Sequence, residues 1–292
     1  MDGYADGAAR ACAELPSLGD GDFRYIADIL NDRFGISLGE QKRSLVAGRL
    51  ARRLRELGLA GFREYVERLE ADRDGAELSE LVDRITTNHS FFFRERGHFD
   101  FLRDTVLPGI EASIAAQSPY PLRIWSAGCA TGEEVYSIAI LLEEYFGPRL
   151  RSVDLGLLAT DISLAALEEA RAGVYAAEKL RETPTGYRLS CFDPAGDGLY
   201  AVKDRYRSMV LFKRLNLMSG NFPMRGKFDV IFCRNVMIYF DPASRERLTR
   251  ALSNYVKPGG YLFIGHSESL PREGCPFEYV MPATYRKGVQ GD

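Results

Sequence analysis

One segment constrains the fold of this chain more than any other: RIWSAGCATGEEVYSIA at 123–139. An apolar strand leads into a glycine-rich turn, and the turn opens directly into an amphipathic helix. An α/β sheet forms a nucleotide-sized pocket in this way, at the carboxyl end of a strand. Gly128 and Gly132 carry no Cβ, so we expect the backbone there to approach a ligand closely. Glu133 and Glu134 occupy the helix start where a phosphate would bind, which favours a cationic or amino-bearing ligand over NAD or ATP.

Beyond residue 120, apolar strands alternate with amphipathic helices, a pattern that indicates a parallel sheet with helices on its faces. We expect strands at 122–126, 155–159, 230–233 and 261–264, and helices at 133–145, shortly after Asp161 and at 242–255. The stretch from about 175 to 213 is too long for an ordinary connection. Its DPAGDG turn and the strand pattern at 209–212 predict a small antiparallel β insertion.

The first part of the chain has a different character. Residues 1–20 are rich in Gly, Ala and Asp without a period, and we expect a flexible tail there. From Phe23 onward apolar residues recur at helical spacing, and Gly58 is well placed to end the second of four helices. The sequence therefore predicts a small all-α domain over 21–88, followed by an α/β domain over 89–292.

Composition narrows the class of protein. A net charge of −3 gives no reason to expect a nucleic-acid partner. The five cysteines are scattered without a CxxC pair, so neither a metal site nor a disulfide framework is indicated. The N-terminus lacks the basic start and apolar core of a signal peptide, and no apolar run approaches the ~20 residues that span a bilayer. We expect a cytoplasmic monomer without membrane insertion.

Polar residues follow several of the expected strands. The carboxyl ends of parallel strands meet at one edge of a sheet, so these residues should surround one ligand site. Asp161 has two interpretations, both open: its carboxylate accepts hydrogen bonds from ribose hydroxyls, or it caps the helix that follows. The other residues at this edge are Asn216, Leu217, Arg234, Asn235 and Tyr239.

The segment TTNHSFFFRE at 86–95 lies where the helical part meets the α/β part. Three consecutive phenylalanines are not expected on an open surface, so we predict a buried aromatic plug at an interdomain hinge. Asn88, Ser90 and Arg94 would then be placed to close over a ligand.

These motifs together resemble the CheR family, the methyltransferases that modify bacterial chemoreceptors. The resemblance rests on TTNHSFFFRE, SAGCATGEEVYSIA, ATDIS, FDVIFCRNVMIYFD and GYLFIGHSESL, in the family's order. FGISLGEQKRSLVAGRLARRLRELGL resembles the family's N-terminal domain, so the likeness covers about residues 21 to 287.

The resemblance implies a class I (Rossmann-like) methyltransferase that uses S-adenosyl-L-methionine, leaves S-adenosyl-L-homocysteine, and converts receptor glutamates to γ-methyl esters. The pathway it serves would control motility or another output. Position 90, commonly Thr in the family, is Ser here and keeps the hydroxyl. The cofactor-binding residues that the resemblance implies are Asn88, Ser90, Arg94, Glu134, Asp161, Asn216, Leu217, Arg234 and Asn235.

This chemistry needs no general base, because a glutamate of pKa about 4.3 is already ionised at neutral pH. We expect Arg94 to orient the glutamate or the cofactor carboxylate, and Tyr239 to lie near the transferred methyl, where an aromatic face favours a cation. His266 then has no task as a base, and we expect His89 and His98 to be boundary and surface residues. Glu133 should support the helix start, while Glu134 holds the donor.

Two surfaces are candidates for partner binding. Lys42, Arg49, Arg52 and Arg53 form a basic stripe that is either a solvated flank or, as the resemblance implies, the contact for a receptor's acidic cytoplasmic helical bundle. The β insertion resembles the part that, in some family members, docks a receptor's C-terminal pentapeptide by strand addition.

The sequence disfavours two other functions. A Rossmann oxidoreductase is disfavoured by the lack of a GxGxxG, and a catalytically silent binding module is disfavoured by the chemistry-bearing residues that the chain retains.

Overall fold

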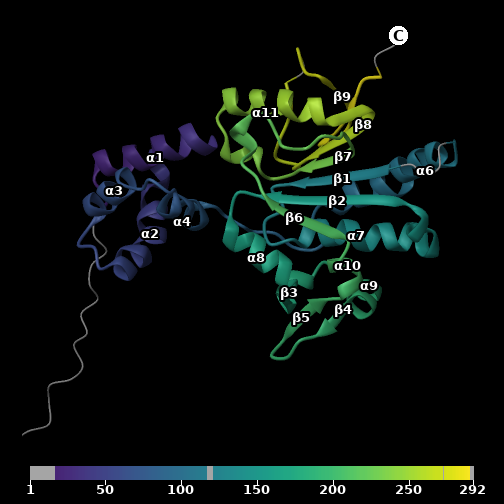
Figure 1. Cartoon of the computed structure of the whole chain (residues 1–292), viewed down its shortest axis with the longest axis horizontal. Helices are drawn as coiled ribbons and strands as arrows, with labels where there is room; N and C mark the ends of the chain where they lie inside the picture. Colours follow the sequence, from purple (N-terminus) through teal and green to yellow (C-terminus); the bar gives the residue numbers. More distant parts are fainter. Residues whose placement is uncertain (1–16, 117–120, 272, 290–292) are drawn as a thin grey trace, which may run out of the picture.

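The computed structural model describes residues 17–116, 121–271 and 273–289, so most of the tail expected over 1–20 lies outside the described residues. The first described part is a group of four helices, set to one side of a large sheet (Figure 1). They are α1 Asp20–Phe34, α2 Arg43–Leu57, α3 Phe62–Glu70 and α4 Ala76–Ile85. Gly58 ends α2 in the left-handed conformation, with φ 68°, as the sequence predicts.

A seven-stranded sheet in the order β6-β2-β1-β7-β8-β10-β9 forms the larger part of the molecule. The first five strands in this order are parallel to one another, and β10 and β9 continue the sheet antiparallel. The predicted fold class is therefore confirmed. The bounds are β1 Pro121–Ala127, β2 Asp154–Asp161, β6 Val210–Arg214, β7 Phe228–Cys233, β8 Val256–Ile264, β9 Phe277–Met281 and β10 Thr284–Lys287.

Helices cover both faces of this sheet. Strand β7 is buried along its whole length and alternates between two cores. Ile231 and Cys233 share one core with Leu248 of α11, while Val230 and Phe232 share the other with residues of α7. The helices of this part are α5 Arg96–Phe101, α6 Leu107–Ala116, α7 Glu133–Phe146, α8 Leu164–Ala172 and α11 Pro242–Tyr255.

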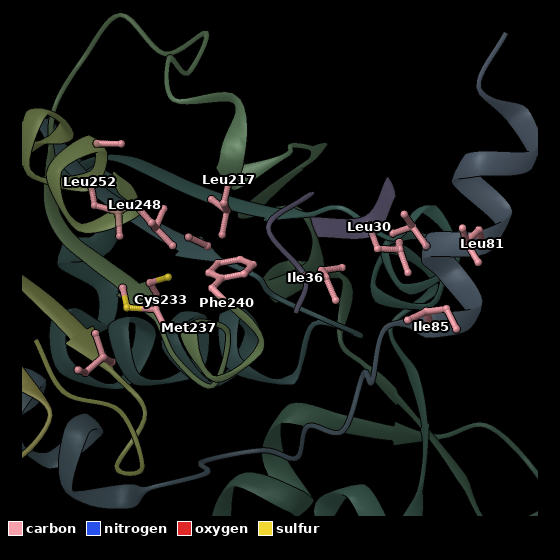
Figure 2. Close-up of a cluster of buried hydrophobic side chains, with 14 of the residues drawn as sticks. Leu30, Ile36, Leu81, Ile85, Leu217, Cys233, Met237, Phe240, Leu248 and Leu252 are labelled. Carbon is pink, nitrogen blue, oxygen red and sulfur yellow. The ribbon is translucent and has the colours of Figure 1, made fainter. Parts of the chain in front are cut away.

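The helical part is joined to the sheet by a continuous apolar cluster. Figure 2 shows Phe240 and Leu217 between the side chains of the helical part and those of α11. Ile36 forms an isolated antiparallel bridge with Phe240, and the amide of Ser37 donates to the carbonyl of Tyr239 over 2.8 Å. Burial of apolar surface is the main driving force for such packing, so this interface holds the two parts together.

A second, three-stranded antiparallel sheet projects below the main one (Figure 1). It confirms the prediction of a small antiparallel insertion, but the strand expected within it at 209–212 is β6, which pairs parallel with β2. The elements of the insertion are β3 Val174–Ala176, α9 Thr185–Cys191, β4 Phe192–Pro194, β5 Leu199–Val202 and α10 Asp204–Arg207. Among the described helices, none is both long and apolar enough to cross a bilayer.

Candidate active site

A cavity of about 430 Å³ lies at the carboxyl ends of β1, β2 and β7, between the sheet and the helical part. This volume falls within the roughly 300–1,000 Å³ typical of small-molecule sites. Its lining brings together twelve of the predicted site residues: Lys42, Arg49, Asn88, Ser90, Arg94, Glu134, Asp161, Asn216, Leu217, Arg234, Asn235 and Tyr239. Their individual roles stay predictions. Arg52 and Arg53 are not part of this lining.

The glycine-rich turn is shaped by packing of the protein on itself. Gly128 and Gly132 have φ 86° and 96°, which favour glycine. A Cβ on Gly128 would lie 2.4 Å from the side chain of Val236, and one on Gly132 would lie 2.9 Å from the Cβ of Ala170. The absence of a Cβ thus allows close packing against Val236 and α8, and Gly128 also lines the cavity, so its expected approach to a ligand stays a prediction. These contacts fix the turn that carries the two glutamates.

The two glutamates after this turn have different surroundings. Glu133 is fully buried and accepts hydrogen bonds from the Thr131 hydroxyl and, at 2.7 Å, from the ammonium of Lys179. Glu134 lines the cavity and accepts from the Ser126 hydroxyl at 2.7 Å. Burial raises the pKa of Glu134, although the nearby Arg234 opposes this. Glu133 thus supports the start of α7, and Glu134 is the carboxylate that faces the cavity.

Arg234 is the centre of a buried charge network at the end of β7. Its side chain is 2% exposed, and its guanidinium lies 3.0 Å from Glu95 and 3.2 Å from Glu134. It also donates to the backbone carbonyl of Arg94. Burial tends to raise the pKa of Glu95, but the charge and hydrogen bonds of Arg234, together with the His266 amide, lower the pKa overall. Arg234 therefore connects the sheet to the segment 86–95, besides lining the cavity.

Asp161 ends β2 with its carboxylate at the cavity wall. The backbone amides of Ala130 and Ser163 each donate to one of its oxygens over 2.9 Å. The following helix begins at Leu164, and its cap is Ser163, whose hydroxyl accepts from the amide of Ala166. The capping interpretation of Asp161 is therefore wrong. Burial raises the pKa of Asp161, and both oxygens keep lone pairs for a hydroxyl donor.

The segment 86–95 forms one wall of the cavity. Phe92 is fully buried, but its ring packs edge-on against Tyr175 and Phe192, at centroid distances of 5.0 and 4.9 Å. The predicted aromatic plug therefore contacts the β insertion, whereas we expected it at an interdomain hinge. Arg94 donates from Nη1 to the carbonyl of His89 over 3.0 Å and lies over the ring of Phe91.

The loops after β6 and β7 complete the wall. Asn216 donates to the carbonyl of Arg33 in α1 over 2.7 Å, and its side-chain oxygen accepts from the amide of Met218. Asn235 has φ 58°, and its backbone amide donates to Glu268 over 3.0 Å. The ring of Tyr239 lies 6.0 Å from the ammonium of Lys42.

Sequence reasoning missed Glu95, Lys179 and Glu268. Glu268 accepts from the backbone amides of Asn235, Gly265 and Ile238 and so ties the loop after β7 to the turn after β8. Burial raises its pKa. Glu95 and Glu268 both stand inside quoted motifs, and Glu268 also follows an expected strand, at 261–264, so these were the available signals. Nothing in the sequence marked Lys179.

The arginines of the basic stripe differ in their surroundings: two bind other parts of the protein, and one lies at the surface. Arg53 forms two hydrogen bonds, of 2.9 and 2.7 Å, with Glu77, whose side chain is 4% exposed. Arg49 donates to the Ile85 carbonyl and to the Thr87 hydroxyl, so both residues serve contacts inside the protein. The Arg52 side chain is 79% exposed and pairs with Glu56 on the same helix.

The prediction that His98 lies at the surface is wrong. Its side chain is fully buried, with ring centroids 5.3 Å from Phe263 and 4.9 Å from His266. Burial lowers the pKa of His98 to about 4, and the charge of Arg234 adds to the effect. Glu95, His98 and His266 lie close enough together to share a metal ion, but Arg234 already balances the charge of Glu95.

The donor set of the cavity is matched to one kind of ligand. Carboxylates at the end of β2 and the start of α7 suit ribose hydroxyls and an amino group, and aromatic rings suit a sulfonium. A site with these groups beyond the carboxyl ends of parallel strands is consistent with the class I S-adenosylmethionine-dependent methyltransferases. The family description "CheR methyltransferase, SAM binding domain" matches residues 88–285, and "CheR methyltransferase, all-alpha domain" matches residues 21–86. The chain therefore belongs to the CheR methyltransferase family, with S-adenosylmethionine as its methyl donor.

Three relatives illustrate the similarity. A chemotaxis protein methyltransferase of Borreliella burgdorferi is 44% identical over 89% of this chain and 91% of its own length. A probable chemotaxis protein methyltransferase of Rhizobium etli is 40% identical over 88% and 96%. A chemotaxis protein methyltransferase of Klebsiella aerogenes is 41% identical over 89% and 87%. The chain covers most of each relative, which supports a role in chemotaxis for this methyltransferase.

Proposed function

We propose that this chain methylates glutamate side chains on the cytoplasmic helical bundle of chemoreceptors and produces γ-methyl esters. The observation that carries the proposal is the extent of the cavity. Its lining runs from Glu134 and Asp161 at the sheet to Lys42 and Arg49 at α2. One cavity therefore offers carboxylates for the methyl donor and cationic side chains for an acidic acceptor.

Different residues of the cavity contact different groups of the methyl donor in this proposal. S-adenosylmethionine supplies a methyl group on a cationic sulfur, together with an α-amino group and a ribose. Asp161 accepts hydrogen bonds from the ribose hydroxyls, and Glu134 faces the positively charged end. The remaining residues proposed to contact the donor are Asn88, Ser90, Arg94, Asn216, Leu217, Arg234 and Asn235, all of which line the cavity.

The acceptor needs orientation rather than activation. A glutamate carboxylate is ionised at neutral pH, so the protein removes no proton from it. Arg94 holds a carboxylate by hydrogen bonds, and Tyr239 presents its ring near the transferred methyl. Correct placement of reacting groups can lower a barrier by roughly 7–11 kcal/mol, which is enough to make positioning the main source of catalysis.

In this proposal the two domains have different functions. Residues 21–88 recognise the receptor, and residues 89–292 transfer the methyl group. Lys42 and Arg49 at the cavity and Arg52 at the surface contact the receptor helices. A receptor's C-terminal pentapeptide docks by strand addition at the β insertion, whose sheet has open edges at β3 and β4. The protein acts as a monomer in the cytoplasm.

The test is methylation of a receptor's cytoplasmic fragment with labelled S-adenosylmethionine. We expect base-labile methyl groups, released as methanol, on specific glutamates of the fragment. A fragment with Gln at those positions should take up no label. Label that resists base, or that appears equally on the Gln fragment, would contradict glutamate esterification. Titration with S-adenosylhomocysteine and with NAD on the same sample should show binding of the first alone.

A further inference from the structure

Lys179 connects the β insertion to the active-site segment. It lies just after β3, in a short 3-10 helix at Ala177–Leu180. Its ammonium is 2.7 Å from the backbone carbonyl of Ser90 and 2.7 Å from a carboxylate oxygen of Glu133. A single cation therefore holds together a loop of the site, the first residue of α7 and the insertion.

The surroundings of this contact differ from those of a surface ion pair. The Glu133 side chain is fully buried, while that of Lys179 is 32% exposed. Among the described residues, Lys179 is the cation that pairs with Glu133. Removing one partner of a buried pair leaves the other charge without compensation, which is strongly destabilising.

The backbone and the ring of Phe92 support the same connection. The Phe92 amide donates to the carbonyl of Lys179 over 3.2 Å, and the Phe92 ring packs between Tyr175 and Phe192 of the insertion. The segment is thus held at positions 90 and 92. Asn88 and Arg94, on either side of these two points, line the cavity.

We propose that Lys179 is a positioning residue for methyl transfer. It fixes the peptide at Ser90 and thereby sets the side chains that close over the methyl donor, an inference that rests on the proposed donor contacts of Asn88 and Ser90. The hydrogen bond to Ser90 has a charged donor, a type that contributes more than a neutral one. Because Lys179 belongs to the insertion, the geometry of the donor site depends on a part of the chain outside the main sheet.

The test compares three variants by titration with S-adenosylhomocysteine and by amide hydrogen exchange. Lys179→Met removes the charge and keeps most of the side-chain length. Lys179→Arg keeps a cation that can bridge Ser90 and Glu133. Lys203→Met is the matched control, because Lys203 lies in the insertion and pairs with Asp193 at 3.7 Å, away from the cavity.

We expect Lys179→Met to bind S-adenosylhomocysteine about tenfold more weakly, the size expected when a charged hydrogen bond is lost. Amides of residues 87–92 should exchange faster, and the KM for the donor should rise more than kcat falls. Lys179→Arg should restore most of the affinity, and Lys203→Met should match the unchanged protein. Lys179→Gln, which keeps one hydrogen-bond donor, replaces Lys179→Met if that variant does not fold.

Two results would overturn the proposal: unchanged affinity and exchange in Lys179→Met (or in its Gln replacement), or the same loss in Lys203→Met. If Lys179→Arg does not restore binding, the proposal is also contradicted, because the loss in Lys179→Met would then not result from the missing cation. A different outcome, in which the unchanged protein binds no S-adenosylhomocysteine, would contradict the proposed function instead.

Discussion

Glu95 and Arg234 are 139 positions apart in the sequence, yet the carboxylate of one lies 3.0 Å from the guanidinium of the other. The pair joins the segment at 86–95 to the end of β7. Glu134 approaches the same guanidinium to 3.2 Å, so one cation is shared by two carboxylates next to the cavity.

Replacing Arg234 tests this network. Arg234→Met leaves Glu95 and Glu134, each 13% exposed, without a cation, and we expect the free energy of unfolding to fall by about 3–5 kcal/mol. Arg234→Lys should have a smaller effect, because it keeps the charge and loses the branched geometry. Urea denaturation measures both, with Arg250→Met as the control at an exposed pair. A loss below about 1 kcal/mol, the usual value of a surface pair, would contradict the network.

Asp161→Asn should weaken binding of the methyl donor and its product. Asparagine keeps a single acceptor oxygen, so it cannot satisfy the amides of Ala130 and Ser163 and a ribose diol together. We expect affinity for S-adenosylhomocysteine to fall at least about tenfold. Asp154→Asn, at the opposite end of β2 in an exposed pair with Arg123, is the control in the same calorimetric titration. Equal affinities of the two variants would argue against a ribose contact.

Arg94→Ala should remove most of the turnover and leave the fold intact. Misplacement of a reacting group can cost about a hundredfold in rate, and we expect a loss of that order in kcat for receptor methylation. The thermal unfolding midpoint should change little, because the Arg94 side chain makes one described hydrogen bond, to His89. Arg96→Ala, at an exposed neighbour, should retain activity. Near-normal turnover in Arg94→Ala would exclude a catalytic role.

His98 should make the protein less stable in mild acid. Its folded pKa is about 4, below the value near 6.5 of an unfolded histidine, so the unfolded chain takes up a proton first as the pH falls. Stability should therefore decrease from about pH 6.5 down to about pH 4, by up to about 3 kcal/mol. His98→Met should lose less stability over this range, and His89→Met should follow the unchanged protein. Identical pH profiles for all three would contradict this effect.

Arg53 and Arg52 of the basic stripe have different surroundings, so substitutions at these two positions should have different effects. Arg53→Glu places a like charge beside the buried Glu77, so it should unfold the helical part more easily, by at least about 2 kcal/mol. Arg52→Glu should preserve stability and slow receptor methylation, most strongly at low salt. Thermal unfolding and methylation rates of the two proteins separate the effects. An Arg52→Glu enzyme of normal activity at every salt concentration would show that this side chain contacts no receptor.

The sequence predicted those features that depend on local pattern. The strand, turn and helix at 123–139 and the strand–helix alternation after it were sufficient for the fold class. The family motifs were sufficient for the methyl donor. His98 was misplaced because its burial comes from tertiary packing of α5 against Phe263 of β8 and against His266, which the local sequence does not show. The strand at 210–214 was grouped with the insertion, because periodicity does not distinguish a parallel edge strand from an antiparallel one.

Long-range polar contacts could not be predicted in the same way. Glu95 and Glu268 find their partners across 139 and 33 positions, and no local spacing marks such a pair. The glycines of the turn were recognised from the sequence, but their packing against Val236 and Ala170 was not, since these residues lie in other parts of the chain. These contacts depend on tertiary packing alone.

The meeting point of the two family descriptions, at residues 86–88, lies in the wall of the cavity, which Thr86, Thr87 and Asn88 line. The border between the two domains is thus part of the active-site cavity and not only a linker. A substitution at this border therefore changes the lining of the cavity as well as the connection between the two domains.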